Sequence, residues 1–216
     1  MTLDDHGWGA TVPLRVNDHR AHVRLDGPAD GPVWAFANAL GTDLRVWAPL
    51  LPRLEARHFV RYDKRGHGLS ELTPGPYTMD RLADDLAGVL DAVGAERAVV
   101  VGLSIGGLVA QSLAARRPDL VQALVLMDTA PKIGTAEVWN ERIAAVAEGG
   151  IERLADGTME RWFAPSFREG RPEEVGFWRT MLTRTPPAGW VACAEAVRDA
   201  DLTDAAARIA VPTLCL

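Results

Sequence analysis

The sequence predicts an α/β fold with a mostly parallel central sheet. Short apolar runs typical of buried strands alternate with segments of helical periodicity between residues 33 and 127. Two further strand-like segments, residues 12–17 and 21–26, flank the turn residues Asn17-Asp18-His19 and predict a hairpin before this alternation. Strands that alternate with helices form parallel sheets, and ligands of such sheets bind beyond the carboxyl ends of the strands.

Composition excludes several function classes. The chain has 216 residues, of which 48% are hydrophobic and 24% charged, enough for one sizeable core. Its net charge is −6 and it has no basic stripe, so we expect no nucleic-acid partner. It has no apolar run of roughly 18–20 residues and no apolar segment near the N-terminus, so we expect neither a membrane span nor a secretion signal.

The two cysteines, Cys193 and Cys215, lie far apart in the sequence and have no metal-ligand spacing. They are expected to be free thiols in a reduced, cytoplasmic setting. We expect neither a metal nor a cofactor.

The elements follow in order from local signals. Residues 33–37 and 59–62 predict strands, and residues 47–54 predict a helix between them. Thr78 can cap a helix that runs to about Val93, since the apolar residues between them fall on one helical face. Gly94 is expected to end this helix.

The stretch from Ala98 to Gly107 carries the clearest chemical signal. Three valines, residues 99–101, form a buried strand, and Gly102-Leu103-Ser104-Ile105-Gly106 fits the pattern G-x-S-x-G. Residues 107–116 predict a helix of small residues. A serine at the apex of a tight strand–turn–helix is typical of a nucleophile elbow, which identifies Ser104 as the candidate nucleophile.

The rest of the chain divides into two parts. Residues 121–127 predict another strand that ends at Asp128, so we assign residues 1–131 to the core. Residues 132–201 contain no strand-like run and predict a cap of four helices at 136–147, 151–163, 173–183 and 190–198. Four of the seven tryptophans lie there, to pack the cap or to line a pocket. Residues 202–216 return to the core and end in a strand at 211–216.

These motifs together resemble the α/β-hydrolase superfamily and, within it, the 3-oxoadipate enol-lactonases. The general resemblance rests on the serine motif and on Asp63-Lys64-Arg65-Gly66-His67-Gly68-Leu69-Ser70. The narrower one rests on Asn38-Ala39-Leu40-Gly41-Thr42, on Asp128-Thr129-Ala130-Pro131-Lys132-Ile133-Gly134-Thr135, and on the cap motifs Glu160-Arg161-Trp162-Phe163 and Pro187-Ala188-Gly189-Trp190 through Leu202.

The resemblance implies a carboxylic ester hydrolase that opens 3-oxoadipate enol-lactone through an acyl-Ser104 intermediate, in the degradation of protocatechuate and catechol. It places the two oxyanion donors at the backbone N–H groups of Leu40 and Ile105. The small-molecule lactone carries a free carboxylate, for which Lys132 is the first candidate partner, followed by Arg142 and Arg198. Trp139 is a candidate pocket wall.

The base and the acid of the triad are not found in this sequence. All five histidines precede Ser104, whereas the resemblance places an acid after the strand that begins at Val211 and a histidine after one further strand. We therefore expect the remainder of the core to be absent, the activity of this chain to be impaired, and its exposed sheet edge to favour self-association or a complementing C-terminal fragment.

Residues within the chain offer weaker substitutes for the missing partners. Asp128 follows a strand where some hydrolases keep the acid, but it also belongs to the ordinary lactonase loop. His67 is more simply a structural residue of its turn, and His58 lies at the wrong end of a strand. Two other functions stay open: a general carboxylesterase or C–C hydrolase, and a non-catalytic binding protein on the same scaffold.

Overall fold

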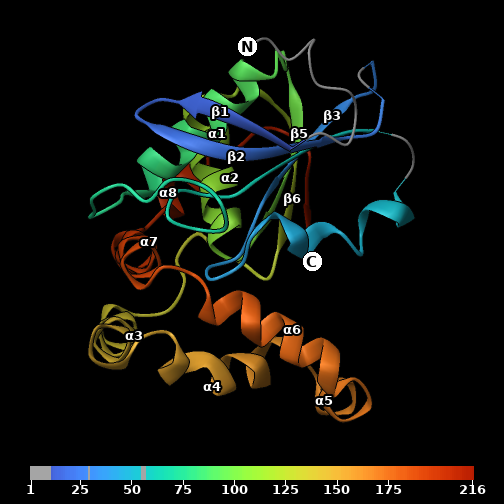
Figure 1. The fold of residues 1–216 in the computed structure, drawn as a ribbon. Coiled ribbons are helices and arrows are strands. Elements are labelled where there is room, and N and C mark those ends of the chain that lie inside the picture. The colour runs from blue at the N-terminus through green and yellow to red at the C-terminus, as the bar shows by residue number, and fades with distance from the viewer. Residues whose placement is uncertain (1–10, 29, 55–56) are drawn as a thin grey trace.

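The computed structural model describes residues 11–28, 30–54 and 57–216, which form a seven-stranded mixed sheet with helices on both faces (Figure 1). The strand order is β1-β2-β4-β3-β5-β6-β7. The pairs β1/β2 and β2/β4 are antiparallel and the others are parallel. The predicted α/β fold with a mostly parallel sheet is confirmed. The strands are β1 Thr11–Val16, β2 His19–Asp26, β3 Val33–Ala37, β4 His58–Tyr62, β5 Ala98–Leu103, β6 Val121–Met127 and β7 Thr213–Cys215.

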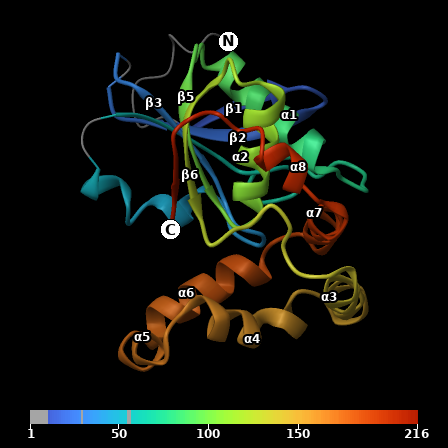
Figure 2. The same cartoon turned by 180° about the vertical axis from the view of Figure 1, so that it is seen from behind.

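Two helices that follow strands complete the core of the sheet. Helix α1, Met79–Ala92, begins at Thr78, whose hydroxyl accepts a hydrogen bond from the N–H of Arg81. It ends before Gly94, which adopts a φ of +70°. Helix α2, Ile105–Arg116, is buried on nearly all sides because it lies between the sheet, α1 and the short helix α8, Thr203–Ala206 (Figure 2).

One predicted helix is replaced by two shorter ones. The segment expected to be helical at residues 47–54 instead forms the 3-10 helices η2, Leu44–Trp47, and η3, Leu51–Arg53. Pro49 and Pro52 lack the N–H that a continuous α-helix needs, so regular hydrogen bonding stops at each of them. The side chain of Asp43 caps η2 by accepting from the N–H of Arg45.

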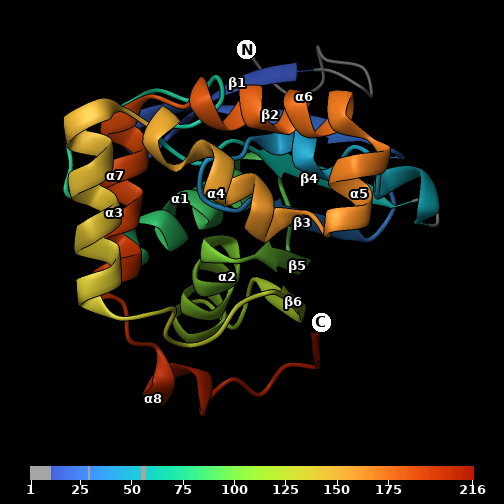
Figure 3. The same cartoon turned by 90° about the horizontal axis from the view of Figure 1, so that it is seen from below.

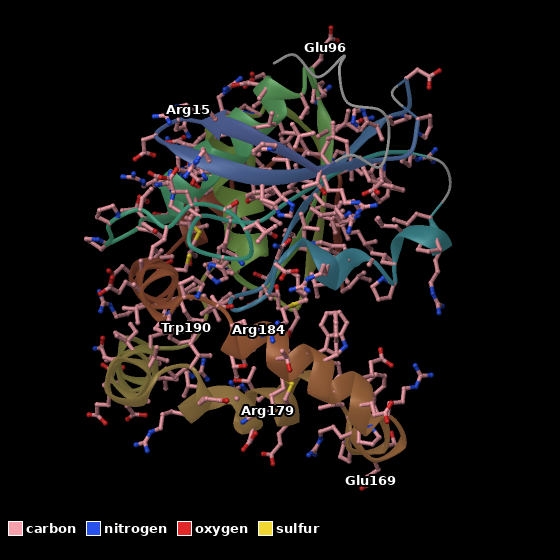
Figure 4. The ribbon with its side chains drawn as sticks, in the orientation of Figure 1. Arg15, Glu96, Glu169, Arg179, Arg184 and Trp190 are labelled. Carbon is pink, nitrogen blue, oxygen red and sulfur yellow. The ribbon has the colours of Figure 1, made fainter. Side chains whose placement is uncertain are left out.

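Five helices lie across the carboxyl end of the sheet (Figures 1 and 3). Helix α3 packs against α7, and α4 packs against α6. Helix α5 was not predicted, because six residues carry too little periodicity to be recognised. Figure 4 shows Glu169 of α5 at the opposite end of the molecule from Glu96, which precedes β5. The helices are α3 Ala136–Gly149, α4 Glu152–Trp162, α5 Pro165–Gly170, α6 Pro172–Thr183 and α7 Pro187–Asp199.

A buried ion pair ties the turn after β4 to helix α1. The side chain of Arg65 is fully buried, and its Nε and Nη2 each donate to a different carboxylate oxygen of Asp85 at 2.6 Å. The ring of Tyr77 covers the guanidinium at 5.4 Å. A two-bond pair of this kind satisfies both charges where water does not reach them.

We predict that Asp85→Asn lowers the free energy of unfolding by about 3–5 kcal/mol, because it removes the only buried counter-charge of the guanidinium in the described residues and leaves the half-exposed Asp18, 2.9 Å from Nη2, as its remaining carboxylate partner. The matched control is Asp84→Asn, on the same helix. Asp84 pairs with Arg116 at 2.9 Å on the surface, so its loss costs less than about 1 kcal/mol. Urea denaturation at pH 7 measures both values, and equal costs would contradict the assignment.

Candidate active site

Ser104 lies at a strained turn between β5 and α2. Its backbone has a φ of +56° and a ψ of −119°, a conformation that non-glycine residues rarely adopt. The turn is possible only beside glycine, since a Cβ on Gly106 would lie 1.9 Å from the carbonyl oxygen of Ala37. A Cβ on Gly102 would lie 2.4 Å from the carbonyl oxygen of Gly106. This is the nucleophile elbow that the serine motif predicts.

A cavity of about 600 Å³ lies between this turn and the helices that cover the sheet. Ser104, Leu40 and Asp128 line it from the ends of strands. The covering helices contribute four tryptophans, Trp139, Trp162, Trp178 and Trp190. Figure 4 shows Trp190 at the level where these helices meet the body of the sheet. The cavity lining is thus rich in tryptophan on the helix side, and it carries charged and polar groups on both sides.

Two backbone N–H groups beside Ser104 are available to an oxyanion. Ile105 is the first residue of α2, so its N–H has no acceptor within the helix. The N–H of Leu40, in the loop after β3, has no acceptor among the described residues. The neighbouring N–H of Gly41 is not available, because it donates to Nε2 of His67 at 3.1 Å. Both donors thus fall at the positions that the resemblance implied.

The loop from Asn38 to Asp43 is held rigidly at its start. The side chain of Asn38 donates to the carbonyl oxygen of Tyr62 at 3.1 Å and accepts from Nε1 of Trp47 at 2.8 Å. Asn38 is 2% exposed, so these bonds fully satisfy a buried amide. The asparagine that distinguishes this loop therefore joins β4 and η2 to it.

His67 is a structural residue of its turn. It is fully buried, its Nε2 accepts from Gly41 and its Nδ1 donates to the carbonyl oxygen of Arg65 at 3.3 Å. Burial and, second, the positive charge of Lys64 lower the pKa of His67 well below its usual value. The ring is therefore neutral, with both nitrogens occupied.

None of the four described histidines lines the cavity that contains Ser104. His22 pairs with Asp63 at 2.6 Å, and His19 bonds the carbonyl oxygen of Val16 at 3.0 Å. His58 begins β4, at the opposite end of that strand from the cavity. His6 lies outside the described residues.

Asp128 ends β6 and lines the same cavity as Ser104. Its backbone φ is +45° and its N–H donates to the carbonyl oxygen of Leu216 at 3.0 Å. The carboxylate makes no hydrogen bond or ion pair with any side chain in the described part of the chain. Asp128 and Ser104 thus line the same cavity, but no described histidine lies between the Asp128 carboxylate and the Ser104 hydroxyl.

Lys132 and Arg198, two of the cations expected to bind the substrate carboxylate, lie outside the cavity lining. Lys132 is more than half exposed and pairs with Asp201 at 3.0 Å, and it does not line the cavity. Arg198 pairs with Asp199 at 2.7 Å and is also outside the lining. Both departures have the same cause: an adjacent carboxylate holds each cation on the surface. Trp139 lines the cavity as expected, and its Nε1 donates to the carbonyl oxygen of Ile133 at 2.7 Å.

Two arginines line the cavity instead. The guanidinium of Arg142, on α3, lies 4.9 Å from the ring centre of Trp139. Arg161, on α4, donates to Oγ1 of Thr158 at 2.9 Å, and burial and then the charge of Arg142 lower its pKa. Neither has a carboxylate partner among the described side chains. Sequence reasoning did not single out Arg161, which carried no signal beyond its place in the motif Glu160-Arg161-Trp162-Phe163.

Within the described ranges, no group of His, Cys, Asp and Glu side chains is arranged to hold a metal ion. No helix in these ranges is both long enough and apolar enough to cross a membrane.

We predict that acid destabilises the fold partly through His67. The pKa of His67 is lowered in the folded state, so below pH 6.5 the unfolded state binds more protons than the folded state. The free energy of unfolding therefore decreases as the pH is lowered. The contribution approaches about 1.4 kcal/mol per pH unit below that value. His67→Gln keeps a donor and an acceptor, and it should lessen the loss of stability between pH 7.5 and pH 5.5.

Urea denaturation across this pH range measures the effect. Burial also lowers the pKa of His19, but this contribution is common to both proteins and cancels in the comparison. An unchanged pH dependence in the variant would show that His67 is not the group responsible.

Comparisons with known proteins agree with this geometry. Residues 36–161 match the model of the alpha/beta hydrolase fold family. A 3-oxoadipate enol-lactonase of Acinetobacter baylyi is 37% identical over 204 residues, which cover 94% of this chain and 76% of that protein. The crystal structure of the enol-lactonase from Burkholderia xenovorans LB400 superimposes with a TM-score of 0.92 at 38% identity, covering 94% of this chain and 80% of that one.

A thermophilic esterase from Thermogutta terrifontis is more distant. It superimposes with a TM-score of 0.84 at 26% identity, covering 95% of this chain and 78% of that one. The elbow at Ser104, the strand order and these similarities lead to one conclusion: the chain belongs to the α/β-hydrolase family and is a relative of the 3-oxoadipate enol-lactonases.

Proposed function

We propose that this chain is the nucleophile-bearing part of a serine hydrolase that opens 3-oxoadipate enol-lactone to 3-oxoadipate in the degradation of aromatic compounds. The observation that carries the proposal is the shared cavity. Ser104, Leu40 and the two arginines line one cavity, and the N–H groups of Leu40 and of Ile105, the residue after Ser104, have no acceptor among the described residues. The similarity to enol-lactonases supports the same substrate class.

The proposed reaction begins with attack of Ser104 Oγ on the lactone carbonyl. The negative charge that develops on the carbonyl oxygen is stabilised by the N–H groups of Leu40 and Ile105. The ring C–O bond then breaks as the general base passes the proton taken from Ser104 to the ring oxygen, which leaves as an enol. The enol becomes the ketone by losing its O–H proton and gaining one at carbon. Water hydrolyses the acyl-Ser104 ester and releases the second carboxylate. No bound metal is part of these steps.

The general base of this reaction lies outside the described residues in our proposal. The described histidines are held in other contacts and do not line the cavity. We therefore expect the 216-residue polypeptide by itself to react slowly at both the acylation and the deacylation step.

Arg142 and Arg161 bind the free carboxylate of the lactone in this proposal. Neither guanidinium is in an ion pair with a described carboxylate, although Asp128 and Glu174 line the same cavity, so both can bind an anion that enters it. Their position opposite Ser104 would orient the lactone carbonyl toward the nucleophile, with Trp139 as one wall.

We predict that Ser104→Ala abolishes reaction with the enol-lactone. Intact-mass spectrometry after incubation should show one acyl adduct on the unmodified chain and none on the variant, and turnover should fall to the rate in buffer. Ser166→Ala, at an exposed serine on α5 outside the cavity lining, is the control and should behave like the unmodified chain.

A substrate panel separates the proposal from its main alternative, a general carboxylesterase. The apolar cavity and the likeness to an esterase at 26% identity favour that alternative over a binding protein. Acylation by simple aryl esters, with no reaction with the enol-lactone, would replace the lactonase proposal with the esterase.

We predict that Arg161→Met and Arg142→Met each weaken binding of the anionic lactone by about 10- to 100-fold, the usual value of a charge-assisted hydrogen bond. A lactone of the same size without a carboxylate should lose less than about threefold, because it makes no ionic contact. The control is Arg153→Met, an exposed position on α4 outside the lining. Calorimetric titration with Ser104→Ala in all backgrounds measures binding without turnover, and equal losses for both lactones would argue against an ionic contact.

A further inference from the structure

Lys64 is a buried ammonium group that the proposed reaction does not yet use. It follows Asp63 after strand β4, is 3% exposed, and has no ion pair with any carboxylate in the described residues. Its Nζ donates to the carbonyl oxygen of Ala39 at 2.6 Å and to that of Thr42 at 3.3 Å. Burying a charge is costly unless hydrogen bonds compensate, so these two carbonyls are the contacts that hold it.

The carbonyl of Ala39 and the N–H of Leu40 belong to the same peptide group. A trans peptide is planar, so its C=O and N–H point in opposite directions. A donor that fixes the oxygen of Ala39 therefore fixes the direction of the Leu40 N–H. Lys64 acts on the far side of the peptide whose near side faces the cavity of Ser104.

The carbonyl oxygen of Ala39 accepts three donors in all. Besides Lys64 Nζ, it accepts from the N–H of Thr42 at 3.2 Å and from Oγ1 of Thr42 at 2.9 Å. Hydrogen bonds in a chain polarise one another, and a charged donor has the largest effect. The amide of Leu40 thus becomes a stronger donor than an isolated peptide.

The next peptide N–H of the loop, that of Gly41, already has a hydrogen-bond acceptor. The N–H of Gly41 donates to His67, and Gly41 adopts a φ of +76° with no room for a Cβ, which would lie 2.3 Å from Cδ1 of Leu182. The loop therefore cannot exchange Leu40 for Gly41 by a small rotation.

We propose that Lys64 is a positioning residue that orients and polarises the Ala39–Leu40 peptide as an oxyanion donor. It acts through that peptide and does not touch the substrate. The inference rests on acyl transfer at Ser104, but not on the identity of the lactone.

The charge of Lys64 is sensitive to mildly alkaline pH. Burial lowers its pKa to about 8, an effect that the carboxylates of Asp63 and Asp43 partly oppose. Cys193 lies on α7, Asp63 is the first residue after β4, and Asp43 precedes η2. His67, in the same turn as Lys64, is neutral. Burial raises the pKa of the Cys193 thiol to about 12, so that thiol keeps its proton while Lys64 loses its own.

The first test compares a tetrahedral ligand with a planar one. An alkyl boronic acid forms a tetrahedral adduct with Ser104 that occupies the oxyanion position, whereas adipate, an analogue of the proposed product, does not. Lys64→Met should weaken boronate binding by about 10- to 100-fold. This loss should not exceed the cost of removing an oxyanion donor altogether, because the Leu40 N–H is still present in the variant. Adipate binding should change less than about twofold, because it does not use this N–H.

Val89→Ala controls for general destabilisation. Val89 is a fully buried residue of α1 outside the loop, so its truncation lowers the melting temperature but should leave the ratio of boronate to adipate affinity unchanged. An unchanged ratio in Lys64→Met would overturn the proposal. Boronate binding with no acyl adduct from the enol-lactone, while simple aryl esters do acylate Ser104, would instead count against the proposed substrate and leave this test intact.

The second test needs no substitution at Lys64. The sequence contains two Ala-Leu steps, Ala39-Leu40 and Ala123-Leu124, so labelling with ¹³C′-alanine and ¹⁵N-leucine gives two carbonyl–amide correlations in NMR. The Leu40 signal should shift with a midpoint near pH 8 as Lys64 loses its proton. Leu124, buried in β6, is the internal control and should not move. A Leu40 signal that stays constant from pH 6.5 to pH 9.5 would overturn the proposal even if Lys64→Met fails to fold.

Discussion

The close approach of β3, β5 and α2 at Ser104 is the constraint on which the rest of the site depends. Ser104 keeps its positive φ because neighbouring backbone leaves it no alternative: Gly106 touches the carbonyl of Ala37, and Oγ1 of Thr129 donates to the carbonyl oxygen of Ser104 at 2.8 Å. Strain at a single residue persists only when its surroundings overdetermine it. The same contact sets the start of the oxyanion loop, since that loop leaves β3 directly after Ala37.

A second layer of buried polar contacts supports that first contact. Residues 63–70 make up the turn after β4, and most of its polar side chains bond backbone groups of other segments. Asp63 accepts from the N–H groups of Leu44 and Leu69, at 2.7 and 2.9 Å, and the guanidinium of Arg65 joins α1. Lys64 and His67 hold the loop that carries Leu40. The turn is thus a polar scaffold beneath the Ala39–Leu40 peptide, which explains why so many charged groups are buried there.

The helices across the carboxyl end of the sheet give the cavity its chemical character. They place tryptophans and two arginines opposite a nucleophile whose strain and hydrogen-bond donors come from the core. Under the proposed function, reaction chemistry and substrate selection reside in different parts of the chain, as expected when a common scaffold serves many substrates. In our proposal the core supplies acyl transfer, and the arginines select an anionic lactone.

Local sequence patterns determined most of the backbone of this protein, with the segment from η2 to η3 and helix α5 as exceptions, and they located the turn at Ser104. The strands, the cap at Thr78 and the elbow at Ser104 depend on residues close together in the chain, so their signals are complete in the sequence. The partners of the charged side chains were decided only by the tertiary structure. Lys132 was the expected cation, but Asp201 holds it at the surface. Arg161, which is also partly exposed to solvent, lines the cavity from the C-terminal turn of α4. Likewise, nothing local to Lys64 indicates that its ammonium lies behind the peptide of Leu40. That contact joins residues 25 positions apart, and only folding brings them together.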